Sequence, residues 1–237
     1  MAKKAETPRE VVVYYDEENK HIKERKTLLG KKLDGDYASY YANGQVMVRM
    51  SFRNGMRQGE AEAYYREGQI RERAAFLDDR FEGDYTCWYE NGQIREKETY
   101  RSGKLNGPYL MYYRNGQAKE EESFKDGKLH GPYRSWYKTG QLKEEGFFEN
   151  DRREGEYKAY HRNGQVKEQA AYRNGKLAGK FRSFNEKGEK IRTLIDDEEV
   201  VESEEELLDK ERQADNMLRD LETFREEDVE SNRREKP

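Results

Sequence analysis

The sequence predicts an all-β fold: an elongated antiparallel β-meander of 24-residue hairpin repeats, followed by a C-terminal α-helix. Three observations support this prediction. Glycine recurs every 24 residues from Gly35 to Gly179, and a second glycine keeps the same step from Gly44 to Gly188. Aromatic runs alternate with Asn-Gly or Asp-Gly pairs between these glycines, a pattern typical of β-hairpins. Recurrence without insertion identifies a repeat protein, in which each unit contacts only its neighbours.

Each unit is predicted to contain two short strands and two tight turns. In the unit that opens at Gly107, an aromatic run leads to Asn115-Gly116, and a second run leads to Asp126-Gly127. Asn-Gly between strand-like runs is a strong hairpin signal, because both central residues of a type I′ turn need positive φ. Pairs of this kind therefore predict a turn at both ends of every strand.

Side chains alternate across a strand, so the repeated positions can be sorted by face if the first turn is a two-residue loop. Small, aromatic and β-branched columns are predicted to share the drier face, together with one glutamate column at its edge. These columns are Tyr37, Tyr85, Tyr109, Tyr133 and Tyr157; Ser39, Ala63, Cys87, Met111, Ser135 and Ala159; Tyr41, Tyr65, Tyr89, Tyr113 and Tyr137; Val46, Ile70, Ile94, Ala118, Leu142 and Val166; Phe52, Phe76, Tyr100, Phe124, Phe148 and Tyr172; and Glu72, Glu96, Glu120, Glu144 and Glu168.

The opposite face is predicted to carry an aromatic column beside a basic column. The aromatic column is Tyr40, Tyr64, Trp88, Tyr112, Trp136 and Tyr160, and the basic column is Arg71, Arg95, Lys119, Lys143 and Lys167. Aromatic residues supply contact area at interfaces, and basic residues supply steering and hydrogen bonds. We interpret these columns as candidate partner-binding residues. Simple cross-strand packing of the aromatic residues is the competing interpretation.

Composition favours a thin repeat sheet over a thick globular core. Only 33% of the 237 residues are hydrophobic and 41% are charged, yet there are 18 tyrosines. A sheet of stacked units needs less apolar residue than a globular domain of this length.

Residues that carry catalytic or metal chemistry are scarce. Cys87 is the only cysteine, which excludes an internal disulfide and a multi-cysteine metal site. Of the three histidines, His130 and His161 are explained by their repeat positions, and no phosphate loop, zinc spacing or nucleophile elbow occurs. The sequence therefore predicts a protein that is not an enzyme and that has no cofactor or metal.

Charge is distributed unevenly along the chain. Residues 196–237 contain 18 acidic and 7 basic residues, a net charge of −11, which leaves a net charge of +7 on residues 1–195. This contrast indicates either docking of the acidic segment on the basic body or a segment that deters polyanions. Nucleic acid is therefore an unlikely partner, all the more because Glu121 and Glu145 are expected on the aromatic face.

Three regions are expected. Residues 1–34 form a polar leader and a degenerate capping repeat, 35–195 form six full units and a partial seventh, and 196–237 form an acidic helix and tail. Ser203 and Glu206 make a capping-box pattern before the helix. Its apolar face would carry Leu207, Ala214, Met217, Leu218, Leu221 and Phe224. The helix is expected to dock on the sheet, to pair with another copy or to bind a partner.

The N-terminus has no apolar segment of a signal peptide, and no stretch is long enough to cross a bilayer. We therefore expect a cytoplasmic protein.

The repeat resembles a known family. Gly-x-Tyr-x-x-Tyr/Trp-Tyr-x-Asn-Gly-Gln-x-Lys-Glu, followed by Phe/Tyr-x-x-Gly-Lys-x-x-Gly, is similar to the MORN-repeat variant of bacterial proteins and is clearest from Gly107 to His130. The resemblance implies an elongated antiparallel sheet and a protein-binding role, in its specific form the antitoxin or immunity component of a toxin–antitoxin pair. The alternatives are a self-associating scaffold and peripheral membrane or nucleic-acid attachment through the basic aromatic face.

Overall fold

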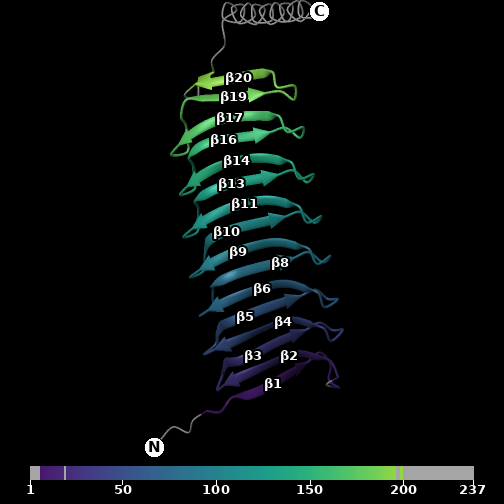
Figure 1. The fold of residues 1–237 in the computed structure, drawn as a ribbon. Coiled ribbons are helices and arrows are strands. Elements are labelled where there is room, and N and C mark those ends of the chain that lie inside the picture. The colour runs from purple at the N-terminus through teal and green to yellow at the C-terminus, as the bar shows by residue number, and fades with distance from the viewer. Residues whose placement is uncertain (1–5, 19, 196–197, 200–237) are drawn as a thin grey trace, which may run out of the picture.

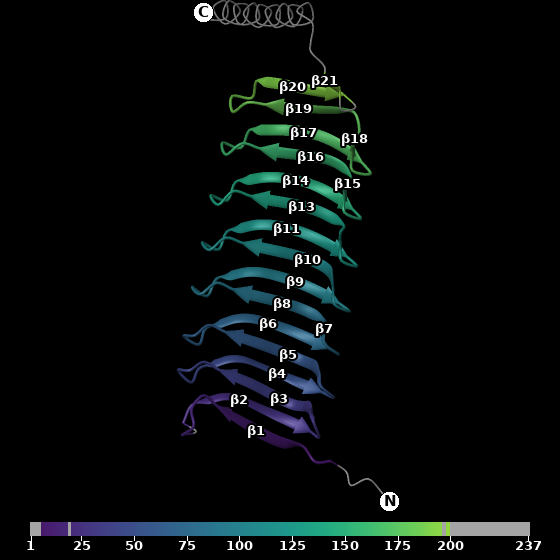
Figure 2. The same cartoon turned by 180° about the vertical axis from the view of Figure 1, so that it is seen from behind.

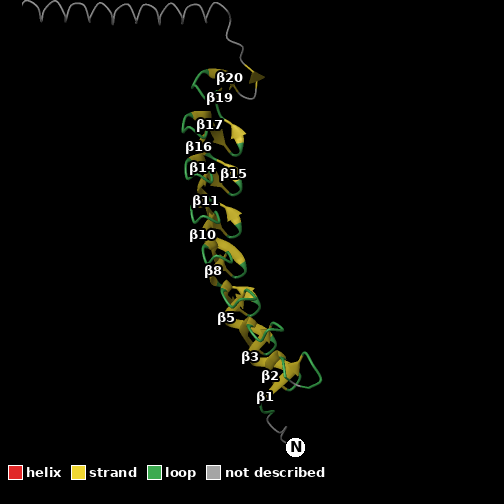
Figure 3. Ribbon diagram, turned by 90° about the vertical axis from the view of Figure 1, so that its right-hand side faces the viewer, coloured by secondary structure: helices red, strands yellow, loops and turns green. Residues whose placement is uncertain are grey.

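The computed structural model describes residues 6–18, 20–195 and 198–199, and these form one antiparallel sheet of 21 strands (Figure 1). Successive strands pair with one another along the chain, so the sheet is a meander. The predicted all-β repeat sheet is confirmed, whereas the predicted C-terminal helix lies outside the described residues. Seen from the side, the stack of strands curves gently along its length (Figure 3).

Strand lengths repeat with the unit. The strands are β1 (Arg9–Tyr14), β2 (Ile22–Leu29), β3 (Lys32–Tyr40), β4 (Val46–Arg53), β5 (Met56–Tyr64), β6 (Ile70–Leu77), β7 (Arg80–Phe81), β8 (Gly83–Trp88), β9 (Ile94–Arg101), β10 (Lys104–Tyr112), β11 (Ala118–Lys125), β12 (Lys128–Leu129), β13 (Gly131–Trp136), β14 (Leu142–Glu149), β15 (Arg152–Arg153), β16 (Gly155–Tyr160), β17 (Val166–Arg173), β18 (Lys176–Leu177), β19 (Lys180–Phe184), β20 (Lys190–Ile195) and β21 (Glu198–Glu199). β7, β12, β15 and β18 each follow a second turn. Figure 2 shows β7, β15 and β18 along one side of the stack, at the ends of the long strands.

The second turn of each unit is the predicted two-residue loop. Ser102 and Gly103 have φ of 50° and 78°, so both central residues are left-handed as a type I′ turn requires. Asp78 and Asp79 adopt the same geometry with φ of 50° and 66°. Aspartate tolerates this region better than most residues, which is why the loss of glycine at this turn is accommodated.

The first turn differs from the prediction, because its loop has three residues. Tyr113 N–H donates to the Gln117 carbonyl over 2.8 Å, and Gly116 N–H donates to the Tyr113 carbonyl over 2.9 Å. Of the loop residues only Gly116 has positive φ, at 85°. This is a type I turn followed by a left-handed glycine, the usual three-residue hairpin.

A β-bulge follows each three-residue loop. Tyr112 lies opposite Ala118 and Met111 lies opposite Glu120, so Lys119 is an extra residue between the two pairs. The same shift occurs in the other units, for example between Cys87 and Trp88. The longer loop and the bulge offset one another, so the register beyond the bulge is the predicted one.

Buried hydrophobic side chains collect on one face of the sheet, here called the core face. Ala61, Ala74 and Phe76 form one buried cluster, against which Met50, Phe81 and Tyr85 pack, and Tyr157, Ala159 and Ala170 form a second. The ring that follows the opening glycine of a unit makes a T-shaped pair with the ring near the end of its second strand, as for Tyr109 and Phe124 with ring centroids 5.9 Å apart. This geometry suits the quadrupoles of the rings.

Side chains near the first turn join each unit to the next. Tyr89 Oη donates to the Tyr112 carbonyl over 2.8 Å, and Asn91 Nδ2 donates to the Arg114 carbonyl over 3.0 Å. The tyrosine bond recurs at Tyr41, Tyr65, Tyr113 and Tyr137. Each unit thus has side-chain contacts to its neighbour in addition to the strand pairing.

Candidate functional site

The first turn and the bulge change the predicted faces of two columns. Residues directly opposite one another share a face, and Tyr112 lies opposite Ala118 rather than Lys119. The apolar column that contains Ala118 therefore lies with the aromatic column, on the face opposite the core face, and the prediction that it faces the core is wrong. The prediction that the basic column lies beside the aromatic column is also wrong.

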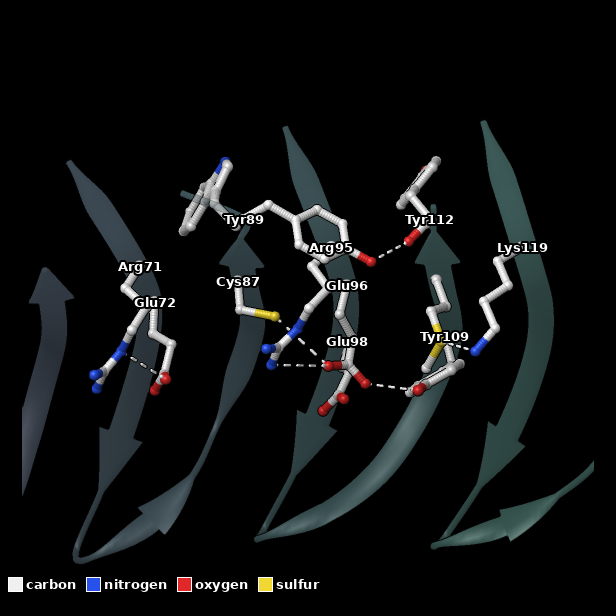
Figure 4. Close-up of polar contacts among 12 residues, drawn as sticks. Arg71, Glu72, Cys87, Tyr89, Arg95, Glu96, Glu98, Tyr109, Tyr112 and Lys119 are labelled. Atoms are coloured by element: carbon white, nitrogen blue, oxygen red, sulfur yellow. Dashed lines mark hydrogen bonds and ion pairs between the residues drawn. The ribbon is translucent and has the colours of Figure 1, made fainter. Parts of the chain in front are cut away.

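The basic column lies on the core face against the glutamate column (Figure 4). Lys119 Nζ lies 3.0 Å from Met111 Sδ and 3.8 Å from Glu120. The corresponding ion pairs are Arg71–Glu72 at 3.1 Å, Arg95–Glu96 at 3.8 Å, Lys143–Glu144 at 3.1 Å and Lys167–Glu168 at 3.5 Å. These five cations therefore neutralise a row of glutamates beside the core. They lie on this face because each is the extra residue of a bulge.

The face opposite the core face, here called the charged face, carries a row of directly opposed residues across the sheet. This central row is Arg49, Glu62, Arg73, Thr86, Lys97, Leu110, Glu121, Arg134, Glu145, Lys158, Gln169 and Arg182. Opposite charges alternate over much of it, and Arg134 lies 3.5 Å from Glu121. Pairs of this kind stabilise neighbouring strands.

Glu62 is the buried centre of this row at its N-terminal end. It accepts hydrogen bonds from Arg49, Arg73 and Tyr64, with Arg73 Nε at 3.0 Å. Burial acts to raise the pKa of Glu62, but the bonds from Tyr64, Arg49 and Arg73 outweigh it and lower the pKa. The carboxylate is thus held charged between two guanidinium groups.

The aromatic column lies on the charged face beside the central row. All six members are half-buried, and two are held by the row itself. The Arg49 guanidinium carbon lies 5.6 Å from the Tyr64 ring centroid, and Tyr160 Oη donates to Glu145 over 2.6 Å. Burial and this bond to Glu145 raise the pKa of Tyr160 to about 12. Tyr64 and Tyr160 are therefore positioned by fixed carboxylates, and all six rings still present part of their surface.

Sequence reasoning missed the central row, because its members belong to two different 24-residue columns that alternate from strand to strand. Arg73, Lys97 and Glu121 occupy the same position in successive second strands. The pairing of Arg49 with Glu62 across the second turn could have revealed the row. That pairing can be recognised only when the strand register is known.

The core face carries one cluster of carboxyl groups that departs from the repeat. Glu98 and Glu122 occupy a position that is Met50, Ala74 or Ala170 in other units. Tyr109 Oη donates to Glu96 over 2.6 Å (Figure 4), and Tyr100 Oη donates to Glu98. Burial, with the adjacent Glu96, raises the pKa of Glu98 to about 7.

Cys87 lies beside this cluster and is 1% exposed. Its thiol donates to Glu96 over 3.5 Å, and burial raises its pKa to about 11. A thiol of this kind is a packing residue, because reactive cysteines have a lowered pKa and are accessible.

Three shallow cavities lie on the charged face. One of 590 Å³ extends across β1 to β5 and is lined by Arg25, Arg49 and Glu60 among others. The other two, of 330 and 250 Å³, lie at the C-terminal end and share Glu156 and Lys158. Among the described residues, no group of His, Cys, Asp and Glu is arranged to hold a metal ion. Over the same part of the chain, no helix has the length and hydrophobicity needed to cross a membrane.

The family model of the MORN repeat variant matches six consecutive segments of the chain. These are residues 33–54, 57–78, 81–102, 105–126, 129–150 and 153–174, together 132 of 237 residues. No curated protein matches the chain. Each matched segment contains one three-residue loop with its bulge and ends within the two-residue turn that closes the hairpin. The chain therefore belongs to the MORN repeat variant family and is a repeat protein involved in binding.

Proposed function

We propose that the chain is a non-enzymatic repeat protein that holds a protein partner along the charged face. The observation that supports this most directly is the aromatic column: one ring per unit, on the face away from the buried clusters, and none of them buried. Equivalent rings lie two strands apart, about 9.6 Å. A partner surface or extended segment can therefore contact several rings in succession.

The contacts of the aromatic column suit a binding surface. Tyr64 and Tyr160 are held by Glu62 and Glu145, so little side-chain entropy is lost on contact. Aromatic residues dominate binding energy at interfaces. The basic column has no part in this surface, because its cations pair with glutamates on the core face.

The specific form of the proposal is an antitoxin or immunity role with a toxin as the partner and a cytoplasmic location. Its support is the similarity of the repeat to bacterial MORN variants. The partner's identity would decide it.

A pull-down from native lysate tests the proposal with three forms of the full chain. Trp88→Ala with Trp136→Ala removes two rings of the aromatic column. Arg95→Gln with Lys143→Gln changes two residues of the basic column and is the matched control. We expect one stoichiometric protein to be retained by the wild type and the control. The tryptophan variant should lose at least about tenfold in affinity, because truncated hot-spot residues cost about 2 kcal/mol or more.

Thermal unfolding would show that all three forms are folded. Retention of the partner by the tryptophan variant would refute the aromatic docking surface. Loss of the partner from the control alone would place binding on the core face instead.

A further inference from the structure

A groove crosses the charged face at its C-terminal end. The cavities of 330 and 250 Å³ adjoin there, and Glu156 and Lys158 line both. Together they extend from Pro132 on β13 to Arg182 on β19. The five strands β13, β14, β16, β17 and β19 are crossed in turn, which corresponds to about 19 Å across the sheet.

This groove has a net positive charge. Arg134, Lys158, Lys180 and Arg182 line it, against Glu145 and Glu156. Lys158 lies 3.5 Å from Glu156, whereas Lys180 and Arg182 have no ion pair with another described residue. The positive charge is therefore least compensated at the end of the groove nearest the C-terminus.

An exposed aromatic side chain lies in the groove. Phe147, in the middle of β14, is 43% exposed. The equivalent residues of the other units are small: Ser51, Ala75, Thr99, Ser123 and Ala171. Phe147 thus departs from the repeat where the charge pattern also changes, and an apolar partner group would cover it.

The N-terminal cavity of the same face has the opposite charge. Arg25 and Arg49 line it, against Glu10, Asp36, Glu60 and Glu62. An acidic segment would therefore be attracted to the C-terminal groove and repelled by the N-terminal cavity. The charged face is therefore negative at its N-terminal cavity and positive at its C-terminal groove.

The chain itself contains an acidic segment that follows β21 in the sequence. Residues 200–237 contain 14 acidic and 7 basic residues and several large apolar ones. They follow β21, which pairs with β20, the strand adjacent to β19. A segment of 38 residues would span about 57 Å as a helix, so the whole groove is within its reach.

We propose that residues 200–237 dock in this groove of their own chain, with carboxylates against Lys158, Lys180 and Arg182 and apolar side chains against Phe147. Trp136 and Tyr160 lie on the same face of β13 and β16, so the docked segment would compete with a partner for that end of the aromatic column. This consequence rests on the proposed function, whereas the docking itself does not.

Energy transfer from single tryptophans tests the docking without any partner. Thr223→Cys provides a labelling site on a Cys87→Ala background, which is tolerated because Ala63 and Ala159 fill the same column. Trp88→Phe leaves Trp136 as the donor, and Trp136→Phe leaves Trp88, about 19 Å further along the sheet. We expect transfer to a short-range acceptor from Trp136 to exceed that from Trp88 several-fold, at every protein concentration.

Variants of the groove then identify the contact. Lys158→Glu with Arg182→Glu should reduce transfer from Trp136 at least threefold, whereas Lys97→Glu with Arg101→Glu in β9, with the same charge change, should not. Phe147→Ser should also reduce transfer, and it introduces the residue found at Ser51 and Ser123, so folding is retained. Raising the salt concentration should weaken transfer, because exposed charges are screened.

Three results would overturn the proposal. Transfer that rises with protein concentration would show docking on a second copy. Equal transfer from both tryptophans would show no preference for the groove. Unchanged transfer in both groove variants would place the segment elsewhere. None of these results bears on the aromatic docking surface, whose test is retention of a partner, so the two proposals fail separately.

Discussion

Two glutamates on opposite faces of the sheet show how neighbouring groups set the charge of a carboxyl group that is withdrawn from solvent. Burial acts on Glu62, but hydrogen bonds from Tyr64, Arg49 and Arg73 lower its pKa. Burial also acts on Glu98, where the adjacent Glu96 adds to it and raises the pKa to about 7. The difference is the sign of the nearest groups, because a carboxylate beside cations is stabilised and one beside a second carboxylate is not.

Glu98→Gln should remove a pH-dependent loss of stability. The folded pKa of Glu98, about 7, exceeds the ordinary value of 4.5. Its contribution to stability is therefore complete below pH 4.5 and is lost as the pH rises through 7. We expect the variant to be more stable than the wild type at pH 8 and similar to it near pH 5. Urea unfolding at the two pH values measures this, with exposed Glu67→Gln as the control.

A wild type as stable at pH 8 as at pH 5, with no gain from Glu98→Gln, would contradict this. Glu96 has the opposite pH dependence, because the bond from Tyr109 and other contacts outweigh burial and lower its pKa. Its contribution is lost only as the pH falls below 4.5.

Glu62→Gln should destabilise the fold by about 1–3 kcal/mol, because an uncharged amide can no longer neutralise Arg49 and Arg73 from a buried position. Glu121→Gln is the matched control on the same row. Its ion pair with Arg134 is about half exposed, so its loss should cost about 0–1 kcal/mol. Denaturant unfolding compares the two, and equal costs would show that the buried centre of the row is not special.

At the scale of the hairpin, the two turns of one unit differ in length and in their effect on the sheet. The second turn is a tight two-residue loop with positive φ at both positions, as at Asp126 and Gly127. The first turn is longer and is followed by the bulge at Lys119. The bulge turns the basic side chain onto the glutamates of the core face and leaves the aromatic column with the central row. The faces of the sheet therefore depend on this local irregularity.

Gly127→Ala and Gly146→Ala should have opposite effects. Gly127 has φ of 83°, which strains any residue with a Cβ atom, so alanine should cost about 1 kcal/mol. Gly146 has no positive φ, and an added Cβ would lie 3.5 Å from the Tyr157 ring, an ordinary contact. Ala74 and Ala170 occupy the same column, so alanine at 146 should stabilise the strand by about 0.5–1 kcal/mol.

Chemical denaturation of both glycine variants measures these changes. A gain of stability for Gly127→Ala would show that the second turn does not need a left-handed residue. A large loss for Gly146→Ala would show that the ring of Tyr157 cannot accommodate the added methyl group.

At the scale of the whole molecule, each unit is stabilised by contacts with its neighbouring units. Strand pairing and the side-chain bonds near the first turn join neighbouring units only. The sheet has no second layer among the described residues, so its core consists of side chains on one face that bury one another. Such a fold tolerates changes in the number of units.

Deletion of Gly107–His130 should leave a folded, shorter sheet, because it removes one complete 24-residue period. Stability should fall by about 1–4 kcal/mol, in proportion to the residues lost. Deletion of Gly107–Lys128 removes 22 residues and breaks the period, so that variant should not fold cooperatively. Circular dichroism with urea unfolding distinguishes the two, and equal behaviour would contradict a register set by the period.

The sequence by itself determined the repeat, its period, the positions of the two turns and the columns of residues, because glycine and Asn-Gly positions report backbone conformations that few other residues adopt. It also determined which residues oppose one another beyond the bulge, as at Met111 and Glu120. The aromatic column of the candidate site was likewise predicted to lie opposite the core.

Only the tertiary structure decided on which face of the sheet the basic column lies. One residue more in the first loop, and one more in the bulge, leave the pattern of the sequence unchanged but move Lys119 and its equivalents to the other face. A side-chain period of two makes any one-residue shift exchange the faces. The central row could not be predicted for the same reason. The contact of Glu62 with Arg49 and Arg73 depends on the register of three strands.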